Sequence, residues 1–319
     1  MSTGRWKPDQ LDRSGERAGA SASRRSLLRL GLGGAALVAG TGPIAWPVPA
    51  QTVTVRPTRL GVHTLALDHP MLETYRKGVA AMKALPASDK RSWSYWVSIH
   101  NKYCPHRNWY FLPWHRGYLV GLENIVRSLT KTPGFALPYW DWTTLPRLPE
   151  AFTAAMWGTV ANPLLDTTRL AAPTDTLPAE LVGQPVMDAI YAVTDFELFG
   201  TSRPKGQSSL SSSWQRKVGV QGTLESTPHN GVHNWMGGNM ATMLSPTDPL
   251  FYLHHANCDR IWASWVALGN SNSSDALWQS FVFTNNFVKP TKALYSVAVK
   301  DVLDLTTLGY QYPQQGAYS

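Results

Sequence analysis

The order of apolar and polar side chains predicts a chain built mainly from helices. From Pro70 to Leu85 the apolar residues recur at three- and four-residue intervals, which is the period of one helix face. The pattern continues in a second helix over residues 89–100. A third is expected from about Pro113 through Leu129, and the Gly and Pro of "TPGFALP" end it. We predict a fourth helix over "PHNGVHNWM" and a fifth from about Asp248 through "LFYLHHANCDRIWASWVAL".

Other stretches lack the helical period. Residues 143–188 are rich in Pro and short polar turns, and residues 200–214 have the composition of a surface loop. Near the C-terminus, "ALYSVAV" is typical of a short strand. We therefore predict a mainly α fold: a four-helix bundle with long loops and short peripheral β-strands.

The first fifty residues have a different character. "SRRSLLR" precedes an apolar, Gly/Ala-rich run from Leu30 to Gly40 that is too short to span a bilayer stably. Its paired Arg24 and Arg25 resemble a twin-arginine export signal. We predict that residues 1–50 are this signal, cleaved after Ala50, and that residues 51–319 form one exported catalytic domain, periplasmic or secreted, with no membrane partner after cleavage.

Composition and charge exclude several classes of protein. The chain is 43% hydrophobic and contains 14 Trp, which is too apolar and aromatic for a disordered protein. Without residues 1–50, 22 basic and 18 acidic residues remain, so the net charge is +4 rather than +8. This charge does not indicate a nucleic-acid partner. The two cysteines, Cys104 and Cys258, lie in histidine-rich stretches, and we do not expect them to form a disulfide.

Histidine spacing provides the chemical signal. His229 and His233 lie four residues apart on a predicted helix, so both rings project from one face, although this spacing alone is weak evidence for a metal. The adjacent His254 and His255 point about 100° apart, so at most one is expected to face the same cavity. Asp259, four residues after His255, could accept the spare ring N–H of His255, which favours His255 as a metal ligand and His254 as a structural residue.

Six of the nine histidines fall into two clusters, one upstream and one downstream: His100, His106 and His115; His229, His233 and His255. Imidazole ligands without nearby carboxylates suit copper better than hard, oxygen-preferring ions. Zinc is also bound by three histidines, so a zinc hydrolase stays open at this point. A carboxylate-bridged di-iron bundle fits worse, because the Glu-x-x-His pairs that it needs are missing.

Three longer motifs resemble the tyrosinase and polyphenol oxidase family. They are "CPHRNWYFLPWHRGYL" with "ALPYWDW" after it, "TPHNGVHNWMGG", and "SPTDPLFYLHHANCDRIW". The resemblance extends from about Arg56 to "DVLDLTTLGYQY". It implies two copper ions, a dinuclear type 3 site, held between the helices of a four-helix bundle. The implied ligands are His100, His106 and His115 for the first copper, and His229, His233 and His255 for the second.

The resemblance also implies roles for other residues. Cys104 and His106 match an arrangement in which a thioether joins the cysteine sulfur to a ligand histidine; a free buried thiol is the alternative. Glu225 and Asn230 match the pair that holds a water and helps to deprotonate a phenol in similar enzymes. Alternatively, Glu225 only caps the helix beginning near Pro228.

The loop after His233 lies where relatives place the residue that narrows the mouth over the second copper. Its modest side chains, Thr242, Met243 and Ser245, are expected to leave room for bulky phenols.

Together these features predict a type 3 copper oxidase of phenols. Two copper ions held by neutral imidazoles can each give one electron to dioxygen, so that o-diphenols leave as o-quinones and monophenols are hydroxylated at the ortho position. A catechol oxidase without action on monophenols, or a haemocyanin-like oxygen carrier, could use the same histidines. Many relatives carry a C-terminal shielding domain. Because this chain ends close to "LGYQY", we expect none, and activity without proteolytic activation.

Overall fold

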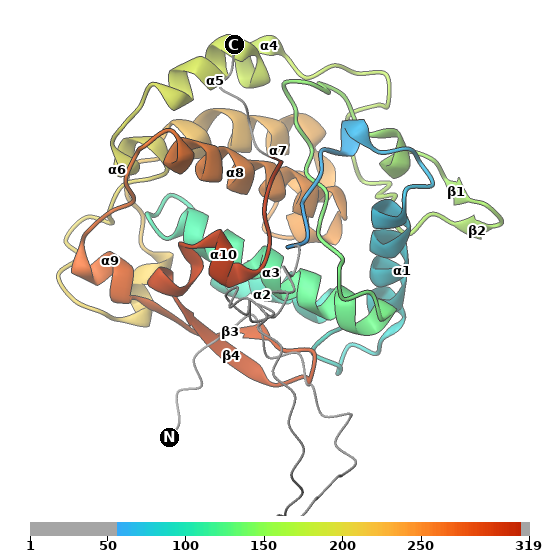
Figure 1. Ribbon diagram of the computed structural model, residues 1–319, viewed down its shortest axis with the longest axis horizontal. Coiled ribbons are helices and arrows are strands. Elements are labelled where there is room, and N and C mark those ends of the chain that lie inside the picture. The colour runs from blue at the N-terminus through green and yellow to red at the C-terminus, as the bar shows by residue number, and fades with distance from the viewer. Residues whose placement is uncertain (1–55, 314–319) are drawn as a thin grey trace, which may run out of the picture. The chain divides into compact units, whose positions relative to one another are not determined.

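A computed structural model describes residues 56–313 of the chain. The predicted export signal at residues 1–50 lies outside the described residues. The described part is mainly helical, with two small hairpins (Figure 1). Within residues 56–313, no helix combines the length and the apolar character needed to cross a bilayer.

The regular elements alternate with long loops. The α-helices are α1 (Pro70–Ala84), α2 (Trp93–Tyr103), α3 (Phe111–Thr130), α4 (Ala179–Val182), α5 (Gln184–Tyr191), α6 (Phe196–Phe199), α7 (Asn230–Met236), α8 (Leu250–Ala267), α9 (Ala276–Ser280) and α10 (Leu305–Leu308). The strands are β1 (Met156–Trp157), β2 (Val160–Ala161), β3 (Val282–Val288) and β4 (Leu294–Ala298). Shorter turns of helix are η1 (Val62–Thr64), η2 (Glu150–Phe152), η3 (Ser212–Arg216), η4 (Glu225–His229), η5 (Gly238–Ala241), η6 (Ser245–Thr247) and η7 (Val299–Val302).

The helices expected from the sequence are confirmed, with shifted ends. Helix α2 begins at Trp93 rather than near residue 89, because the Ser92 hydroxyl accepts the Tyr95 backbone N–H at 3.2 Å and caps the helix there. The fourth predicted helix is divided: η4 is a π-helical turn, and α7 follows it. Pro228 lies inside η4 and has no N–H to donate, which is consistent with a local departure from α-helical geometry.

Helices α2, α3, α7 and α8 surround the histidines. Helix α3 is buried on almost every side, because α1, α8 and β3 all pack against it. Its Tyr118 ring stacks on Trp96 of α2 and on Trp114, each at 4.9 Å between centroids. The Tyr118 hydroxyl donates to the Trp96 carbonyl at 2.7 Å, so the polar end of this buried ring is satisfied. Dense aromatic packing therefore makes α2 and α3 a rigid support.

The strands lie at the periphery, as predicted. Strands β3 and β4 pair antiparallel from Val282 opposite Ala298 to Val288 opposite Leu294, and Figure 1 shows this hairpin beneath α3. The Trp114 indole N–H donates to the Asn286 side chain at 2.9 Å and joins β3 to α3. The two-residue strands β1 and β2 form a separate hairpin beyond α1 (Figure 1).

A buried ionic network fixes the outer side of α8. Asp259 accepts from Arg116 at 2.5 Å, from Arg59 at 2.9 Å, and from the hydroxyls of Tyr310 and Tyr312 at 2.6 and 2.7 Å. Burial acts to raise the pKa of Asp259, but the two guanidinium groups and the two tyrosine hydroxyls together outweigh it and hold the pKa below its ordinary value. The network joins the beginning and the end of the described chain to α8.

Candidate metal centre

The first histidine cluster is assembled from two helices and the loop between them. His100 lies in the last turn of α2, His106 in the loop, and His115 in the second turn of α3. Cys104 joins them, and one ligand atom from each of the four residues lies within 4.8 Å of the others. Tertiary packing, rather than one helix face, brings these residues together.

The second cluster is built on more regular structure. His229 ends η4 and His233 lies one turn later on α7, so the four-residue spacing places both rings on one side, as predicted. Helix α8 contributes His254 and His255. One ligand atom from each of these four histidines also lies within 4.8 Å of the others.

The two clusters face each other inside the bundle. The His115 ring of the first cluster stacks on the His255 ring of the second, with centroids 4.1 Å apart. The His106 and His229 ring centroids are 6.0 Å apart. The structure therefore brings all six predicted ligands into one site.

Hydrogen bonds fix the orientation of four of these imidazoles. In each, Nδ1 faces a carbonyl oxygen: His100 with Met243 O at 2.9 Å, His115 with Phe111 O at 2.8 Å, His233 with Met240 O at 2.7 Å, and His229 with Asn230 Oδ1 at 2.9 Å. A carbonyl oxygen can only accept, so Nδ1 carries the proton and Nε2 keeps a free lone pair. His100 Nε2 and His229 Nε2 are buried with no hydrogen-bond partner among the described residues. A metal ion would satisfy them.

Burial keeps the ligand histidines neutral. Desolvation lowers the pKa of His106 to about 3 and that of His233 to about 4, and it holds the pKa of His100, His115 and His229 well below the ordinary value. A neutral imidazole is the form that binds a metal. The donor set therefore fits copper ions at neutral pH.

The expectation that only one of the adjacent histidines faces the cluster is wrong. Both His254 and His255 offer a nitrogen to it, because side-chain rotation offsets the angle between neighbouring positions on a helix. The His255 Nε2 atom lies 3.3 Å from His233 Nε2. The His254 ring packs 5.2 Å from Trp142, and neither of its nitrogens has a hydrogen-bond partner in the described chain.

The prediction that Asp259 orients His255 is also wrong. Asp259 binds Arg59, Arg116 and two tyrosines on the outer side of α8, and His255 Nδ1 has no hydrogen-bond partner among residues 56–313. The physical reason is charge. Two buried guanidinium groups need a counter-ion more than a neutral imidazole needs an acceptor.

Glu225 connects the second cluster to the loop of the first. Its carboxylate accepts the Arg107 backbone N–H at 2.6 Å, next to His106, and the Thr201 hydroxyl. No side chain caps η4 or α7, so the alternative of a helix cap is wrong. Burial raises the pKa of Glu225 to about 7, although these hydrogen bonds oppose the rise. Thr201, which the sequence did not single out, is part of this arrangement.

Asn230 contacts its neighbouring histidine rather than Glu225. Its side-chain oxygen faces His229 Nδ1, and no direct hydrogen bond joins Asn230 to Glu225 in the described part of the chain. On the loop after His233, Thr242 is exposed, Met243 is half-buried, and Ser245 is only 2% exposed. Ser245 therefore lies beneath the surface. Leu244, which was not predicted to matter, is 47% exposed between them.

The cysteines are free and buried, which confirms that they do not form a disulfide. The Cys104 sulfur lies 3.3 Å from His115 Nε2 and 3.7 Å from His106 Nε2, inside the first cluster. Burial raises the pKa of Cys104 well above its ordinary value. Cys258 is a buried thiol on α8, as expected.

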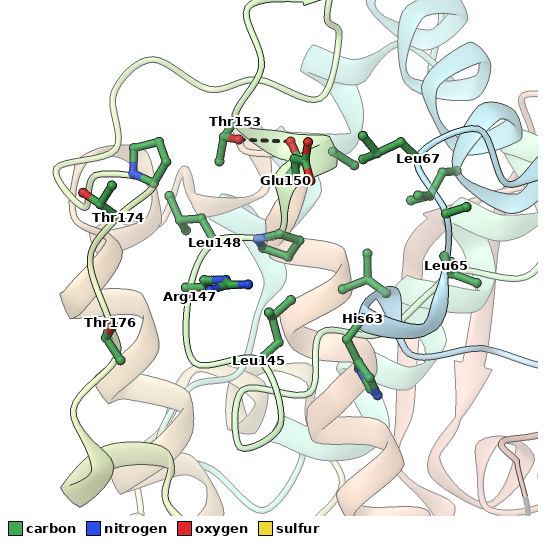
Figure 2. A pocket seen from close by; sticks show the side chains of 16 residues that line it. His63, Leu65, Leu67, Leu145, Arg147, Leu148, Glu150, Thr153, Thr174 and Thr176 are labelled. Atoms are coloured by element: carbon green, nitrogen blue, oxygen red, sulfur yellow. Dashed lines mark hydrogen bonds between the residues drawn. The ribbon is translucent and has the colours of Figure 1, made fainter.

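A separate pocket of about 710 Å³ lies away from this chemistry. Figure 2 shows His63 and Leu65 on one side of it, facing Arg147 and Leu148 on the other. None of the six predicted ligands lines it. The histidine site is therefore defined by its buried donors and not by this surface hollow.

Comparison with known proteins identifies the site. Residues 90–268 match the family model described as the common central domain of tyrosinase. The chain belongs to the tyrosinase family. This membership, the two facing clusters and their free nitrogen lone pairs make the site a dinuclear copper centre of this family.

Similar proteins include plant enzymes of the family. Polyphenol oxidase A1, chloroplastic, of Vicia faba is 31% identical over 297 residues, covering 81% of this chain and 48% of the relative. (+)-Larreatricin hydroxylase, chloroplastic, of Larrea tridentata is 31% identical over 316 residues, covering 85% of this chain and 51% of the relative. The chain thus spans about half the length of these curated relatives. The crystal structure of Grenache (Vitis vinifera) polyphenol oxidase matches with a TM-score of 0.71 at 27% identity, covering 82% of this chain and 86% of that one.

Proposed function

We propose that this tyrosinase-family protein uses dioxygen to oxidise o-diphenols to o-quinones and also hydroxylates monophenols at the ortho position. The observation that carries the proposal is the pair of facing imidazole clusters, in which His115 stacks on His255 at 4.1 Å. Two copper ions, when bound, supply the exchange of two electrons with dioxygen. The activities named for the relatives support this reading.

The protein's own residues hold and enclose the centre. Carbonyl oxygens orient four ligands, as described above. Two phenylalanines add an apolar wall: the Phe111 ring lies 4.7 Å from His229, and the Phe251 ring lies 4.1 Å from His255, between centroids. These rings exclude water from the histidines and strengthen electrostatic interactions inside the site.

Action on a monophenol also needs a base, because a phenol has a pKa near 10 and binds metal as phenolate. We assign this task to Glu225, acting through a water that it holds with Asn230. A carboxylate with a pKa of about 7 is a far better base than an ordinary glutamate. Each carboxylate oxygen has two lone pairs, so Glu225 can accept from Arg107 and Thr201 and still bind a water.

A second candidate is a catechol oxidase that does not act on monophenols. One observation favours it: both Glu225 oxygens already accept a hydrogen bond, and Asn230 faces His229 instead of Glu225. In that case the pair would stabilise the site without removing a phenol proton. Catechols would still react, because they are easier to oxidise.

Oxygen uptake by the copper-loaded protein distinguishes these functions. The substrate is a monophenol with a trace of the matching catechol, which removes the initial lag. Sustained uptake, beyond the amount that the trace catechol consumes, is the expected result. Uptake that stops with the catechol would establish the catechol oxidase, and no uptake with either substrate would indicate an oxygen carrier. We further propose export, which is supported by Arg24, Arg25 and the apolar run after them.

A further inference from the structure

One short loop contacts a ligand of each copper. The Met243 carbonyl accepts from His100 of the first cluster at 2.9 Å, and the Met240 carbonyl accepts from His233 of the second at 2.7 Å. The acceptors are only three residues apart, in residues 237–245, which we call the carbonyl loop. Any shift of this loop therefore moves the hydrogen-bond acceptors of both clusters together.

The carbonyl loop lies closely against a distant segment. Gly237 and Gly238 both have positive φ, 66° and 55°, which other residues rarely adopt. A Cβ atom on Gly238 would lie 2.0 Å from the Thr168 carbonyl oxygen, so the two backbones meet where no side chain fits. The loop is thus shaped by contact with residues near 168.

Asn239 makes the polar part of this contact. Its side-chain amide donates to Asp166 Oδ2 at 2.9 Å, and its backbone N–H donates to the Thr168 hydroxyl at 3.0 Å. Asp166 is itself fixed, because its other oxygen accepts the backbone N–H and the hydroxyl of Thr168 at 2.8 and 2.6 Å. Asn239 is therefore held from both its backbone and its side chain.

Asn239 also sets the two acceptor carbonyls. It directly precedes Met240, and its own carbonyl accepts the Thr242 backbone N–H at 3.0 Å and hydroxyl at 2.9 Å. Thr242 directly precedes Met243. Asn239, anchored to Asp166, therefore fixes the backbone just before each of the two acceptor residues, Met240 and Met243.

We propose that Asn239, anchored by Asp166, is a positioning residue that holds one ligand of each copper through the carbonyl loop. It touches neither copper nor substrate. It acts by keeping the carbonyls of Met240 and Met243 in line with His233 and His100. The proposal rests on the copper centre, but it does not depend on which phenol the protein oxidises or on whether it oxidises any.

The alternative is a loop contact that contributes only to stability. Asn239 and Asp166 are both half-buried, so the hydrogen bond between them could stabilise the fold without any effect on the copper ligands. Copper retention distinguishes the two, since a purely structural contact would alter thermal stability and leave copper affinity unchanged.

The first variant is Asn239→Asp, which places a carboxylate against Asp166. We expect both coppers to be retained about 10-fold less tightly in competition with a chelator, because loss of an outer-shell partner typically costs 10–100-fold in metal affinity. Electron paramagnetic resonance shows whether the loss is joint. An isolated Cu(II) ion gives a signal, whereas a bridged pair is silent, so joint loss leaves little signal from half-loaded protein.

The second variant combines Asp166→Asn with Asn239→Asp. The new asparagine can accept from Thr168 through its oxygen and donate its amide to the new aspartate, so the pair is rebuilt with the partners exchanged. We expect copper retention to return to within a few-fold of the original protein. Asp166→Asn alone keeps an acceptor for Thr168 but can present a second amide to Asn239, and should be intermediate.

Gln184→Glu provides a matched control. Gln184 donates to Asp188 at 2.7 Å on α5, the same amide–carboxylate chemistry at an exposed position away from the carbonyl loop. This change should leave copper retention unaltered.

Three results would overturn the proposal: Asn239→Asp retaining both coppers as tightly as the original protein, loss of copper from one cluster alone, or no recovery in the double variant. All are measured without a substrate. A failure of the proposed phenol oxidation is therefore distinguishable from a failure of this inference.

Discussion

The two histidine clusters use the same ligand chemistry on different supports. In the second, His229 and His233 are one helical turn apart, and α8 supplies the remaining ligand. In the first, His106 lies on a loop whose next residue, Arg107, has a φ of 54°. That loop is fastened from outside by Glu225. Local helix geometry thus builds most of one copper site, while long-range contacts build much of the other.

The two copper sites are therefore sensitive to different changes in the chain. The second cluster should respond mainly to changes in its own helices and, through the Met240 carbonyl, to changes in the carbonyl loop. The first should respond to changes far away in the sequence, because its loop and His100 depend on Glu225 and the Met243 carbonyl. The following predictions test that contrast.

The largest effect is expected from removing a ligand of the second cluster. His255→Ala should reduce bound copper from two ions to one. It should also lower the rate of phenol oxidation by more than about 100-fold, because loss of a residue that only hydrogen-bonds to a ligand already costs up to about 100-fold. Copper analysis of the purified protein measures the first effect. His254→Ala is the paired control and should retain two ions, so copper loss in that variant instead would show that His254 is the ligand.

Breaking the network behind α8 should cost stability rather than copper. Asp259→Asn leaves the buried guanidinium groups of Arg59 and Arg116 without a full counter-charge, which should reduce the free energy of unfolding by about 3–5 kcal/mol. Denaturant unfolding measures the loss. Asp141 pairs with Arg260 at 3.3 Å and is more exposed than Asp259. Asp141→Asn should therefore reduce the free energy of unfolding by less. Selective copper loss in the folded Asp259 variant would restore a role for this residue at the metal.

Removing the proposed base, Glu225, should lower the rate with monophenols much more than the rate with catechols. Glu225→Gln is expected to lower the rate with a monophenol by about 100-fold and to affect catechol oxidation much less. In the original protein the monophenol rate should rise with pH through about 7, because the group with this pKa must be deprotonated to act as a base. The variant should lack this rise. Steady-state rates at several pH values measure both effects.

Thr201→Val tests the same role of Glu225 through the pH at which the rate rises. It removes a hydroxyl that stabilises the charged form of Glu225, so the rise in rate should move to higher pH. An unchanged pH profile in either variant would exclude Glu225 as the base.

The smallest effect is expected at Cys104. Cys104→Ser should weaken copper binding at the first cluster by about 10-fold or less and leave the second unchanged, because the sulfur lies within hydrogen-bonding distance of His106 and His115, which both belong to the first cluster. Mass spectrometry tests the proposed thioether to His106: its formation removes two hydrogen atoms, and the bonded cysteine no longer reacts with thiol reagents. Weaker copper binding at the second cluster would show that the two clusters are not held independently at Cys104.

The sequence predicted what depends on local spacing. The helices, the His229 and His233 pair and the six clustered histidines could all be inferred, because period and ligand type are visible in the residue order. The prediction that Asp259 orients His255 failed because it used the spacing within α8 alone. Its partners Arg59 and Tyr310 come from other parts of the chain.

Backbone acceptors could not be predicted at all. The oxygens that orient His100 and His233 belong to Met243 and Met240, and a carbonyl group is the same whatever the side chain. Thr201 carries no motif of its own either, and only the fold brings it to Glu225. Long-range geometry, rather than residue identity, determines these contacts.

The network around Asp259 also has a consequence for the order of events during synthesis. Arg59 and Tyr312 meet at this carboxylate although 253 positions separate them. The guanidinium groups of Arg59 and Arg116 are synthesised before α8, but the hydroxyl donors Tyr310 and Tyr312 follow it by more than 40 positions. Such non-local contacts form late in folding. A nascent chain that stops short of Tyr310 would carry all six predicted copper ligands, but Asp259 on α8 would still lack its two tyrosine hydrogen bonds.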